Sequence, residues 1–199
     1  ELSEMLSADF SLFYINRENE RRYMADKGDV INGETLDKDI VGQVGRMDSR
    51  GFDVELTYRP VRGLSLTAGY GYTDTRLRKI ATNPYLDGEN LVGKRYAYSP
   101  RHSFYVYADY TIREGVLRGL GFNFDVTYQD EVYRNFSNTS TFPSYWMTDA
   151  SISYRLPNRV RLRLNVNNVF NTDYYNQALG SQYVPGMPRN FLISAAYSL

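Results

Sequence analysis

The residue types that most often carry out chemistry are scarce in this sequence. His102 is the single histidine and there is no cysteine, which excludes disulfides, cysteine nucleophiles and metal sites built from thiolates or several histidines. A Ser–His–Asp triad would have to use His102, and nothing in the sequence pairs with it in that way. We therefore predict a protein that is not an enzyme, with no catalytic residue, no metal and no cofactor, in which His102 lies at the start of a strand.

The composition limits the possible partners and points to an unusual surface. The 23 basic and 23 acidic residues cancel, so no overall basic field indicates nucleic acid. The 199 residues include 19 tyrosines, ten phenylalanines and one tryptophan. No stretch approaches the roughly 18 apolar residues of a membrane helix. The composition does not exclude a membrane β-barrel, because only half of the residues in the strands of such a barrel are apolar.

Apolar and polar residues alternate along most of the chain, which predicts β-strands. The eight expected strands cover residues 6–15, 52–59, 64–72, 104–112, 120–129, 146–155, 160–167 and 191–199. The first is the least regular, because Phe13 and Ile15 fall on its polar face. Short turns at 60–63, 113–119 and 156–159 alternate with long polar connections at 16–45, 77–99, 129–143 and 171–188. This alternation is typical of an antiparallel up-and-down meander.

The apolar side of these strands either packs into a core or faces lipid. A soluble lipocalin-like carrier would turn it inward, whereas a membrane barrel turns it outward and keeps its polar side in a wet lumen. The apolar positions of seven strands hold no ionisable group, and Lys or Arg there would cost ~2–4 kcal/mol at the bilayer midplane. Tyr and Trp gather near the strand ends, as an interfacial girdle requires. We therefore favour the barrel and expect Val106, Phe122 and Leu162 to face outward.

The last part of the chain carries a further pattern. Between residues 182 and 197, the pattern consists of Gln182, Gly186, Pro188, Arg189, Phe191, Ile193, Ser194, Ala195 and Tyr197. This spacing resembles the C-terminal box of the TonB-dependent outer-membrane receptors. The segment NVNNVFNTDY at 165–174 is similar to the penultimate strand of that family, and GFDVEL at 51–56 and SPRHSF at 99–104 are similar to its barrel sequences.

The resemblance implies both a fold and a function. The family consists of 22-stranded barrels with an N-terminal plug, which import scarce nutrients, most often ferric siderophores, with energy from the inner-membrane TonB complex. Residues 1–199 would then be the C-terminal portion of such a barrel, an all-β transmembrane segment of about eight antiparallel strands without the plug or the TonB box. It would lie in the outer membrane of a Gram-negative bacterium, with the long connections extracellular and the C-terminus periplasmic.

The same resemblance implies partners and site residues. Expected partners are outer-membrane lipid, a ferric siderophore or similar nutrient, TonB through the missing N-terminal part, and the barrel-assembly machinery. Arginine suits anionic chelates, and tyrosine offers catechol or hydroxamate groups an aromatic platform. The predicted ligand-binding residues are Arg76, Arg78, Tyr85, Arg95, Tyr96, Tyr133, Arg134 and Tyr183. The predicted C-terminal assembly signal is Phe191, Ile193, Ala195, Tyr197 and Leu199, where the family usually ends in Phe or Trp.

Three alternatives stay open at this point. A self-contained eight-stranded outer-membrane barrel with a structural or adhesive role would pair the strand at 6–15 with that at 191–199. A soluble lipocalin-like ligand carrier would bury the apolar faces. A barrel enzyme would depend on His102, and loss of a hydrolytic activity in His102→Ala would support it. A segment of a larger barrel would instead leave two unpaired edges, so we expect a curved open sheet.

Overall fold

The computed structural model describes residues 5–18, 21–25, 30, 31, 33–35, 37, 40–43, 45–79, 91–157, 159–179 and 182–197. No helix in these residues is long and apolar enough to cross a membrane. The long strands are β1 (Leu6–Glu18), β6 (Arg46–Tyr58), β7 (Leu64–Lys79), β8 (His102–Thr111), β9 (Leu120–Gln129), β12 (Tyr145–Arg155), β13 (Val160–Asn167) and β16 (Asn190–Tyr197). The short strands are β2 (Arg21–Ala25), β3 (Val30–Ile31), β4 (Glu34–Thr35), β5 (Ile40–Gln43), β10 (Val132–Tyr133), β11 (Thr141–Phe142), β14 (Tyr175–Leu179) and β15 (Gln182–Pro185).

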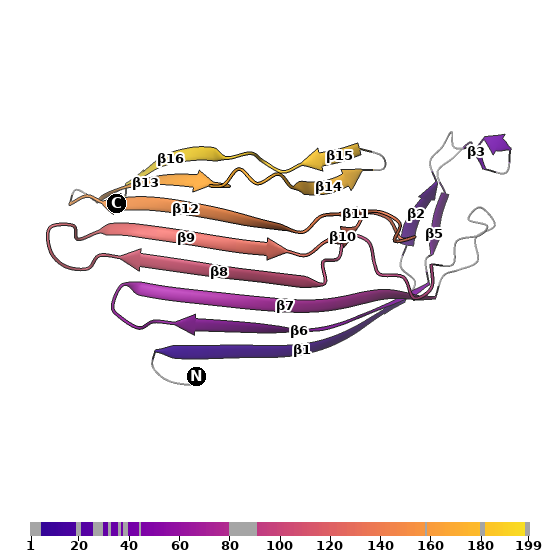
Figure 1. The fold of residues 1–199 in the computed structure, drawn as a ribbon, viewed down its shortest axis with the longest axis horizontal. Helices are drawn as coiled ribbons and strands as arrows, with labels where there is room; N and C mark the ends of the chain where they lie inside the picture. The colour runs from indigo at the N-terminus through magenta and orange to yellow at the C-terminus, as the bar shows by residue number, and fades with distance from the viewer. Residues whose placement is uncertain are drawn as a thin grey trace.

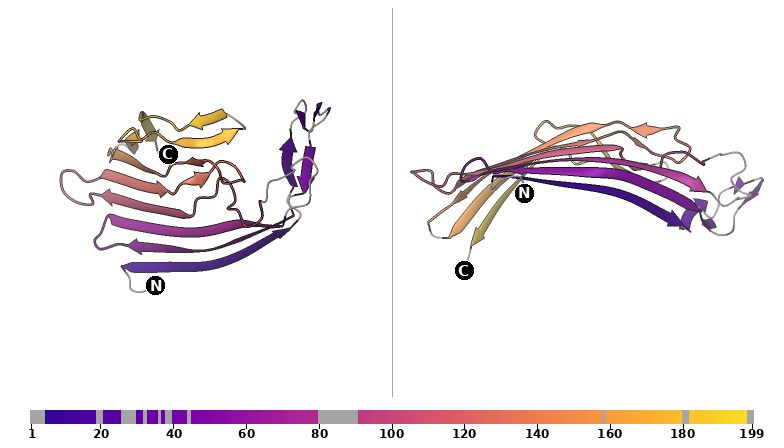
Figure 2. Two further views of the ribbon diagram at one scale, coloured as in Figure 1. Left: turned by 45° about the vertical axis from the view of Figure 1, so that its right-hand side comes forward. Right: turned by 90° about the horizontal axis from the view of Figure 1, so that it is seen from below.

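The eight long strands form one antiparallel sheet in the order β1-β6-β7-β8-β9-β12-β13-β16, so each strand lies beside the next long strand along the chain (Figure 1). This confirms the predicted up-and-down meander of eight strands. The sheet is curved and open (Figure 2). Within the described residues β1 pairs with β6 and β16 pairs with β13, and the two edge strands do not meet. The eight strands therefore do not close into a barrel of their own.

The apolar face of the sheet is exposed, as predicted. Phe122 and Leu162 remain 42% and 44% exposed, and Val106 is half-buried. The hollows on the sheet open instead on the polar face, among residues such as Asp53, Asn123 and Arg163. The apolar side chains thus do not gather into a sealed centre, and the lipocalin-like alternative fails for that reason.

Two bands of aromatic residues bound this apolar face. Tyr128 and Trp146 pack at 4.8 Å between ring centroids on neighbouring strands, and Trp146 also contacts Phe104 at 6.1 Å. Tyr154 lies eight residues beyond Trp146 on β12, or roughly 26 Å along the strand, close to the height of the apolar band of an outer-membrane barrel. The long-loop band holds Phe52, Tyr70, Tyr72, His102, Phe104, Tyr128 and Trp146, and the short-turn band holds Tyr58, Tyr110, Tyr154 and Tyr197.

His102 belongs to the long-loop band. It is the first residue of β8, where the sequence placed it. Its Nδ1 lies 2.7 Å from the hydroxyl oxygen of Tyr70, and its ring lies 5.3 Å from that of Tyr72. Both tyrosines stand on β7, the neighbouring strand. The position of His102 is that of an interfacial aromatic residue.

The irregular alternation of β1 has a packing reason. The ring of Phe13 covers Gly51 on β6, and a Cβ at Gly51 would overlap both that ring and the backbone oxygen of Tyr72. The ring of Tyr105 covers Gly69 on β7 in the same way. An aromatic ring on the polar face thus fills the space above a glycine in the neighbouring strand, a known way to stabilise such glycines.

The strands run further into the long connections than the alternation predicts. β1 continues to Glu18 and β7 to Lys79, and the β6–β7 pairing extends to Arg46 and Lys79 after a register shift between Met47 and Arg46. Small two-stranded ribbons, β2–β5, β3–β4, β10–β11 and β14–β15, form within three of these connections. The paired backbone continues beyond the apolar band, where polar residues occupy positions on both faces and the period-two signal is lost.

The C-terminal strand carries the residues of the predicted assembly signal. Phe191, Ile193 and Tyr197 are more than half exposed on the apolar face of β16, and Ala195 is exposed beside them. Leu199 lies outside the described residues. β16 thus presents an apolar face at an edge of the sheet.

Candidate functional site

Four of the predicted ligand-binding residues meet at the long-loop end of the sheet. The guanidinium carbon of Arg134 lies 4.5 Å from the ring centroid of Tyr183 and 5.5 Å from that of Phe142. The guanidinium carbon of Arg95 lies 5.2 Å from the ring centroid of Tyr133. Cation–π pairs of this kind combine a positive charge with an apolar platform. We call the set Arg95, Tyr133, Arg134, Phe142, Tyr175 and Tyr183 the rim cluster.

The aromatic members of the rim cluster pack on one another. Phe142 stacks on Tyr175 with 4.9 Å between centroids and meets Tyr183 edge-on at 5.5 Å. Phe142 is buried, whereas Tyr175 and Tyr183 are each more than 40% exposed. The buried ring therefore supports two tyrosines whose outer faces are open to a ligand.

A tight turn positions Arg134. The backbone amide of Arg134 donates to the carbonyl of Ser140 at 2.9 Å, and its guanidinium donates to the Ser140 hydroxyl. Asn135 accepts a bond from the Thr139 amide at 3.0 Å, and Asn138 has a left-handed φ of 56°, a conformation that asparagine tolerates. The Nε of Arg134 is buried without a hydrogen-bond partner among the described residues. One donor of this arginine thus stays unused.

Asn138 joins this turn to the neighbouring long connection. Its side-chain oxygen accepts from the Arg95 amide at 2.8 Å, and its side-chain nitrogen donates to the Arg95 carbonyl at 2.9 Å. Below this junction, Leu77 and Leu91 form a small buried core that Tyr96 and Phe136 cover. The rings of Tyr96 and Phe136 meet edge-on at 5.0 Å. The packing of the two connections therefore fixes Arg95 relative to Arg134.

The remaining predicted ligand-binding residues have other surroundings. Tyr96 contributes to the small core beneath the rim cluster. Arg76 and Arg78 continue the even-numbered positions of β7 beyond Tyr72 and so lie on the side that carries the apolar face. Tyr85 lies outside the described residues. Phe142 and Tyr175 were not predicted; Tyr175 could have been found as a tyrosine in a long connection, whereas Phe142 has no polar group to mark it.

Arg76 and Arg78 belong to an ion cluster on the outer side of β6 and β7. Asp74, whose side chain is only 3% exposed, lies 2.9 Å from Arg76, 3.3 Å from Arg101 and 3.5 Å from Arg50. Asp48 lies 3.2 Å from Arg46 and 3.0 Å from Arg78. Burial by itself raises the pKa of Asp74, but the hydrogen bonds and charges of Arg76 and Arg101 outweigh burial and lower this pKa. Both carboxylates are thus ionised at neutral pH.

Acidification is expected to weaken this ion cluster. Since the pKa of Asp74 is lowered in the folded state, its stabilising contribution is complete above the unfolded pKa of about 4. That contribution is lost as the pH falls through the folded pKa. At pH 7, Asp74→Asn should reduce the free energy of unfolding by about 1–2 kcal/mol, and the difference should shrink toward pH 3. Urea unfolding of the full-length protein at pH 7 and pH 3 measures the free energy of unfolding of the wild type and the variant, and Asp173→Asn serves as the control. A wild-type-to-variant difference that is the same at the two pH values would contradict the prediction.

The curved sheet with its exposed apolar face is typical of the wall of a membrane β-barrel. The rim cluster adds arginine and tyrosine side chains at one end of that wall. The chain belongs to the TonB-dependent receptor β-barrel family, because the family described as "TonB dependent receptor-like, beta-barrel" matches residues 2–169. Members of this family are transport receptors of the bacterial outer membrane. In the described part of the chain, no group of three or more His, Asp or Glu side chains is placed to hold a metal ion.

Relatives of known name are siderophore and metal-chelate receptors. The Ferrioxamine B receptor of Salmonella typhimurium is 30% identical over 66% of this chain and 18% of its own length. The Metal-pseudopaline receptor CntO of Pseudomonas aeruginosa is 29% identical over 84% of this chain and 23% of its own length. The chain thus spans about a fifth of the length of these relatives.

Solved receptor structures share the fold. The siderophore receptor PiuA from Acinetobacter baumannii superposes with a TM-score of 0.75 at 24% identity, over 98% of this chain and 26% of the receptor. The ferric yersiniabactin uptake receptor FyuA from Yersinia pestis also gives a TM-score of 0.75, at 18% identity, over 97% of this chain and 27% of the receptor. The eight-stranded sheet therefore has the architecture of a segment of a receptor barrel.

Proposed function

We propose that this chain forms part of the wall and the extracellular rim of an outer-membrane transporter for a ferric siderophore. Family membership and the receptor names of its relatives support this function. The observation that carries it is the rim cluster, in which Arg95 lies over the half-buried ring of Tyr133 and Arg134 over the exposed ring of Tyr183. Energy would come from TonB through a part of the protein outside this sequence.

The chemistry of the rim cluster suits an anionic iron chelate. The oxygen ligands that hold ferric iron carry negative charge, and guanidinium groups bind such oxygens through paired N–H donors. The guanidinium of Arg134 lies over the exposed ring of Tyr183. Tyr175 and Tyr183 offer flat apolar surfaces on which aromatic or conjugated parts of the chelate stack. Charge and platform together favour a catecholate or carboxylate siderophore.

Uptake of labelled iron tests the function. A strain deleted for the full-length gene should lose uptake of at least one ferric siderophore, and the intact gene should restore it. Removal of TonB should abolish the restored uptake while leaving the chelate bound to the cell surface. Uptake that is unchanged by the deletion for every chelate in a panel of catecholates, carboxylates and hydroxamates would contradict the proposal.

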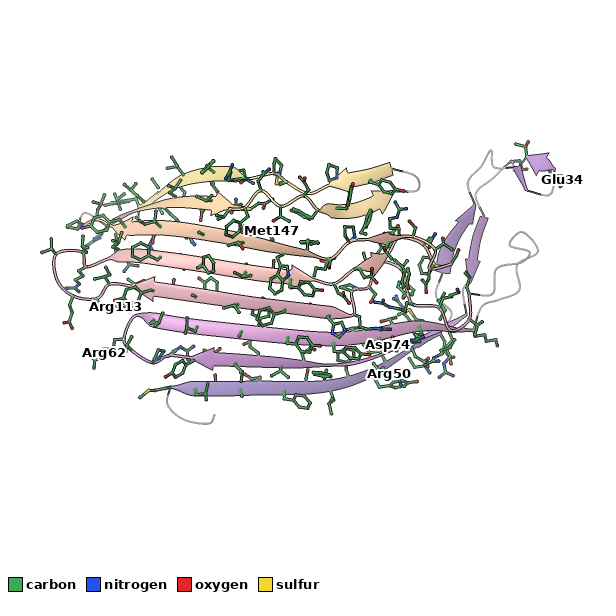
Figure 3. The ribbon with its side chains drawn as sticks, in the orientation of Figure 1. Glu34, Arg50, Arg62, Asp74, Arg113 and Met147 are labelled. Atoms are coloured by element: carbon green, nitrogen blue, oxygen red, sulfur yellow. The ribbon has the colours of Figure 1, made fainter. Side chains whose placement is uncertain are left out.

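The proposed orientation places the long connections outside the cell and the short turns in the periplasm. Glu34, in the β3–β4 ribbon, lies beyond the long-loop end of the sheet, and Arg113 lies at the opposite, short-turn end (Figure 3). A cysteine at Glu34 should react with a membrane-impermeant maleimide on intact cells. A cysteine at Val116, which is 96% exposed in a short turn, should react only after the outer membrane is permeabilised. The segment itself has no cysteine, and equal labelling of both positions on intact cells would reverse or refute the orientation.

We further propose that residues 1–199 are the C-terminal portion of a larger barrel whose lumen holds a separate domain. On the polar face near the short turns, a hollow of about 870 Å³ is lined by six arginines and, among the described residues, by one carboxylate, Asp109. Arg155 and Arg161 are direct cross-strand partners, an arrangement that repels unless an anion lies between them. An acidic surface of a domain inside the barrel would supply that charge. The arginines are Arg113, Arg118, Arg155, Arg159, Arg161 and Arg163.

The exposed apolar face of β16 supports the proposed assembly signal. A strand with one free edge and an outward row of apolar side chains is a template for pairing with another strand. Phe191, Ile193 and Tyr197 form that row. The barrel-assembly machinery is the partner expected to bind it.

A further inference from the structure

We propose that five arginines, four on the outer side of β6 and β7 and one just before β8, bind the phosphate groups of glycolipid in the outer leaflet of the membrane. This inference rests on the proposed orientation, with the long connections outside the cell. The arginine belt consists of Arg46, Arg50, Arg76, Arg78 and Arg101. Figure 3 shows Arg50 and Asp74, on neighbouring strands, near the long-loop end of the sheet.

The register places the arginine belt at the level of lipid headgroups. Phe52 and Tyr72 are cross-strand partners in the long-loop aromatic band, and Arg50 and Asp74 are the next partners on the same face. Two residues correspond to about 7 Å along a strand. Aromatic bands mark the boundary between hydrocarbon and headgroups, so the belt begins within the headgroup layer.

The belt carries more positive charge than its own carboxylates neutralise. Five guanidinium groups share Asp48 and Asp74, which leaves an excess of three positive charges. Glu18 and Lys79, the register partners of Arg46 on either side, carry opposite charges that cancel. Arg50 is the most exposed member, with 63% of its side chain accessible. This face therefore attracts anions.

The carboxylates hold the guanidinium groups in place before a ligand arrives. Asp74 lies beneath three arginines, and Arg76 also donates from Nη1 to the carbonyl of Gly93 at 3.1 Å. Groups that are already fixed lose less entropy when they bind. Guanidinium is also well suited to phosphate oxygens, because its planar N–H donors match their spacing. A fixed row of arginines therefore suits a lipid that carries several phosphates.

The position of the belt favours lipid over cargo. Leu77, on β7, faces the opposite side and is buried under Leu91, Tyr96 and Phe136. Those residues belong to the connections that carry the rim cluster. The belt instead continues the face that bears Phe52 and Tyr72. A ligand on the belt thus lies outside the barrel wall, at the level of the lipid headgroups.

The test uses the full-length protein in nanodiscs of phosphatidylcholine that contain either bisphosphorylated or dephosphorylated lipid A. Native mass spectrometry measures the lipid A retained by each protein. The wild type should retain the phosphorylated form about tenfold more than the dephosphorylated form. The variant Arg50→Gln/Arg78→Gln should lose that preference, although each aspartate keeps at least one arginine partner. The control Arg59→Gln/Arg62→Gln removes the same charge at exposed positions near the short turn at 60–63 and should behave as the wild type.

Several outcomes would overturn the proposal. Equal retention of both forms by the wild type would show that phosphate is not recognised. A double variant that keeps the wild-type preference would show that the arginine belt does not bind the phosphate. Complete displacement of lipid A by millimolar inorganic phosphate would indicate a free-anion site. Should the double variant fail to assemble, Arg50→Gln alone carries the test. The maleimide labelling at positions 34 and 116 checks orientation separately, so loss of lipid binding in a correctly oriented protein counts against the belt alone.

Discussion

Replacement of Arg134 by glutamine is expected to weaken binding of the ferric siderophore by roughly 10- to 100-fold. The guanidinium is the charged member of the rim cluster nearest to the tyrosine platforms, 4.5 Å from the Tyr183 centroid. The guanidinium also donates to the Ser140 hydroxyl, so the group is already oriented and loses less entropy when a ligand oxygen binds. Glutamine keeps much of the side-chain length and removes both the charge and the planar donor pair.

Matched variants separate the charge from the local structure. Ser140→Ala removes the acceptor of the Arg134 side chain but leaves the backbone bond between the two residues, and it should retain most of the affinity. Arg134→Lys keeps the charge and should give an intermediate affinity, since lysine lacks the guanidinium fork. Tyr183→Phe should bind nearly as the wild type, whereas Tyr183→Ala should lose the platform.

Equilibrium binding of the ferric chelate to the purified full-length protein gives the affinity, and whole-cell uptake gives the transport rate. An Arg134→Gln protein that binds and transports as the wild type would remove the rim cluster from the cargo site. The control variant Arg62→Gln, in the short turn at the opposite end of the sheet, should leave binding unchanged. Measurement of Arg95→Gln in the same experiment shows which of the two cation–π pairs contributes more to the affinity for the chelate.

The strands and their faces could be predicted because one physical constraint acts on every residue of the spanning segments. Each side chain there contacts either lipid or the lumen, so the sequence alternates with period two. Beyond Tyr72 the outward positions hold the polar residues Asp74, Arg76 and Arg78, so polar residues stand on both faces and the alternation of apolar and polar residues ends. The strand nevertheless continues to Lys79, because backbone pairing with β6 does not depend on apolar side chains.

The site was only partly predictable, because its geometry depends on contacts between distant segments. Arg95 and Tyr133 meet because Asn138 binds both backbone groups of Arg95, across 43 residues. No spacing in the sequence indicates that contact. The outward placement of Arg76 could have been predicted, since extending the period-two pattern from Tyr72 through Asp74 reaches it on the same face. Residue type alone indicated that these arginines could bind anions, whereas the strand register determines on which face of the sheet each arginine lies.

The substitution Phe124→Arg is expected to cause the largest loss of assembled protein. Phe124 lies midway along β9 between Leu120 and Tyr128 on the outer face, and it is 47% exposed. A charge at the bilayer midplane of a barrel costs ~2–4 kcal/mol. The folded barrel should therefore be less stable, and the amount in the outer membrane should fall sharply.

The lumen side of the same strand provides the control. Thr127 stands three residues along β9, on the polar face, where an arginine remains hydrated. Thr127→Arg should assemble in nearly normal amounts, and Phe124→Leu should do so as well, because it changes the volume without adding a charge. Heat-modified migration of membrane fractions on gels measures the folded protein. If Phe124→Arg assembles as well as Thr127→Arg, the apolar face does not contact lipid, and the rim cluster and the arginine belt would then have to exchange their assigned sides of the wall.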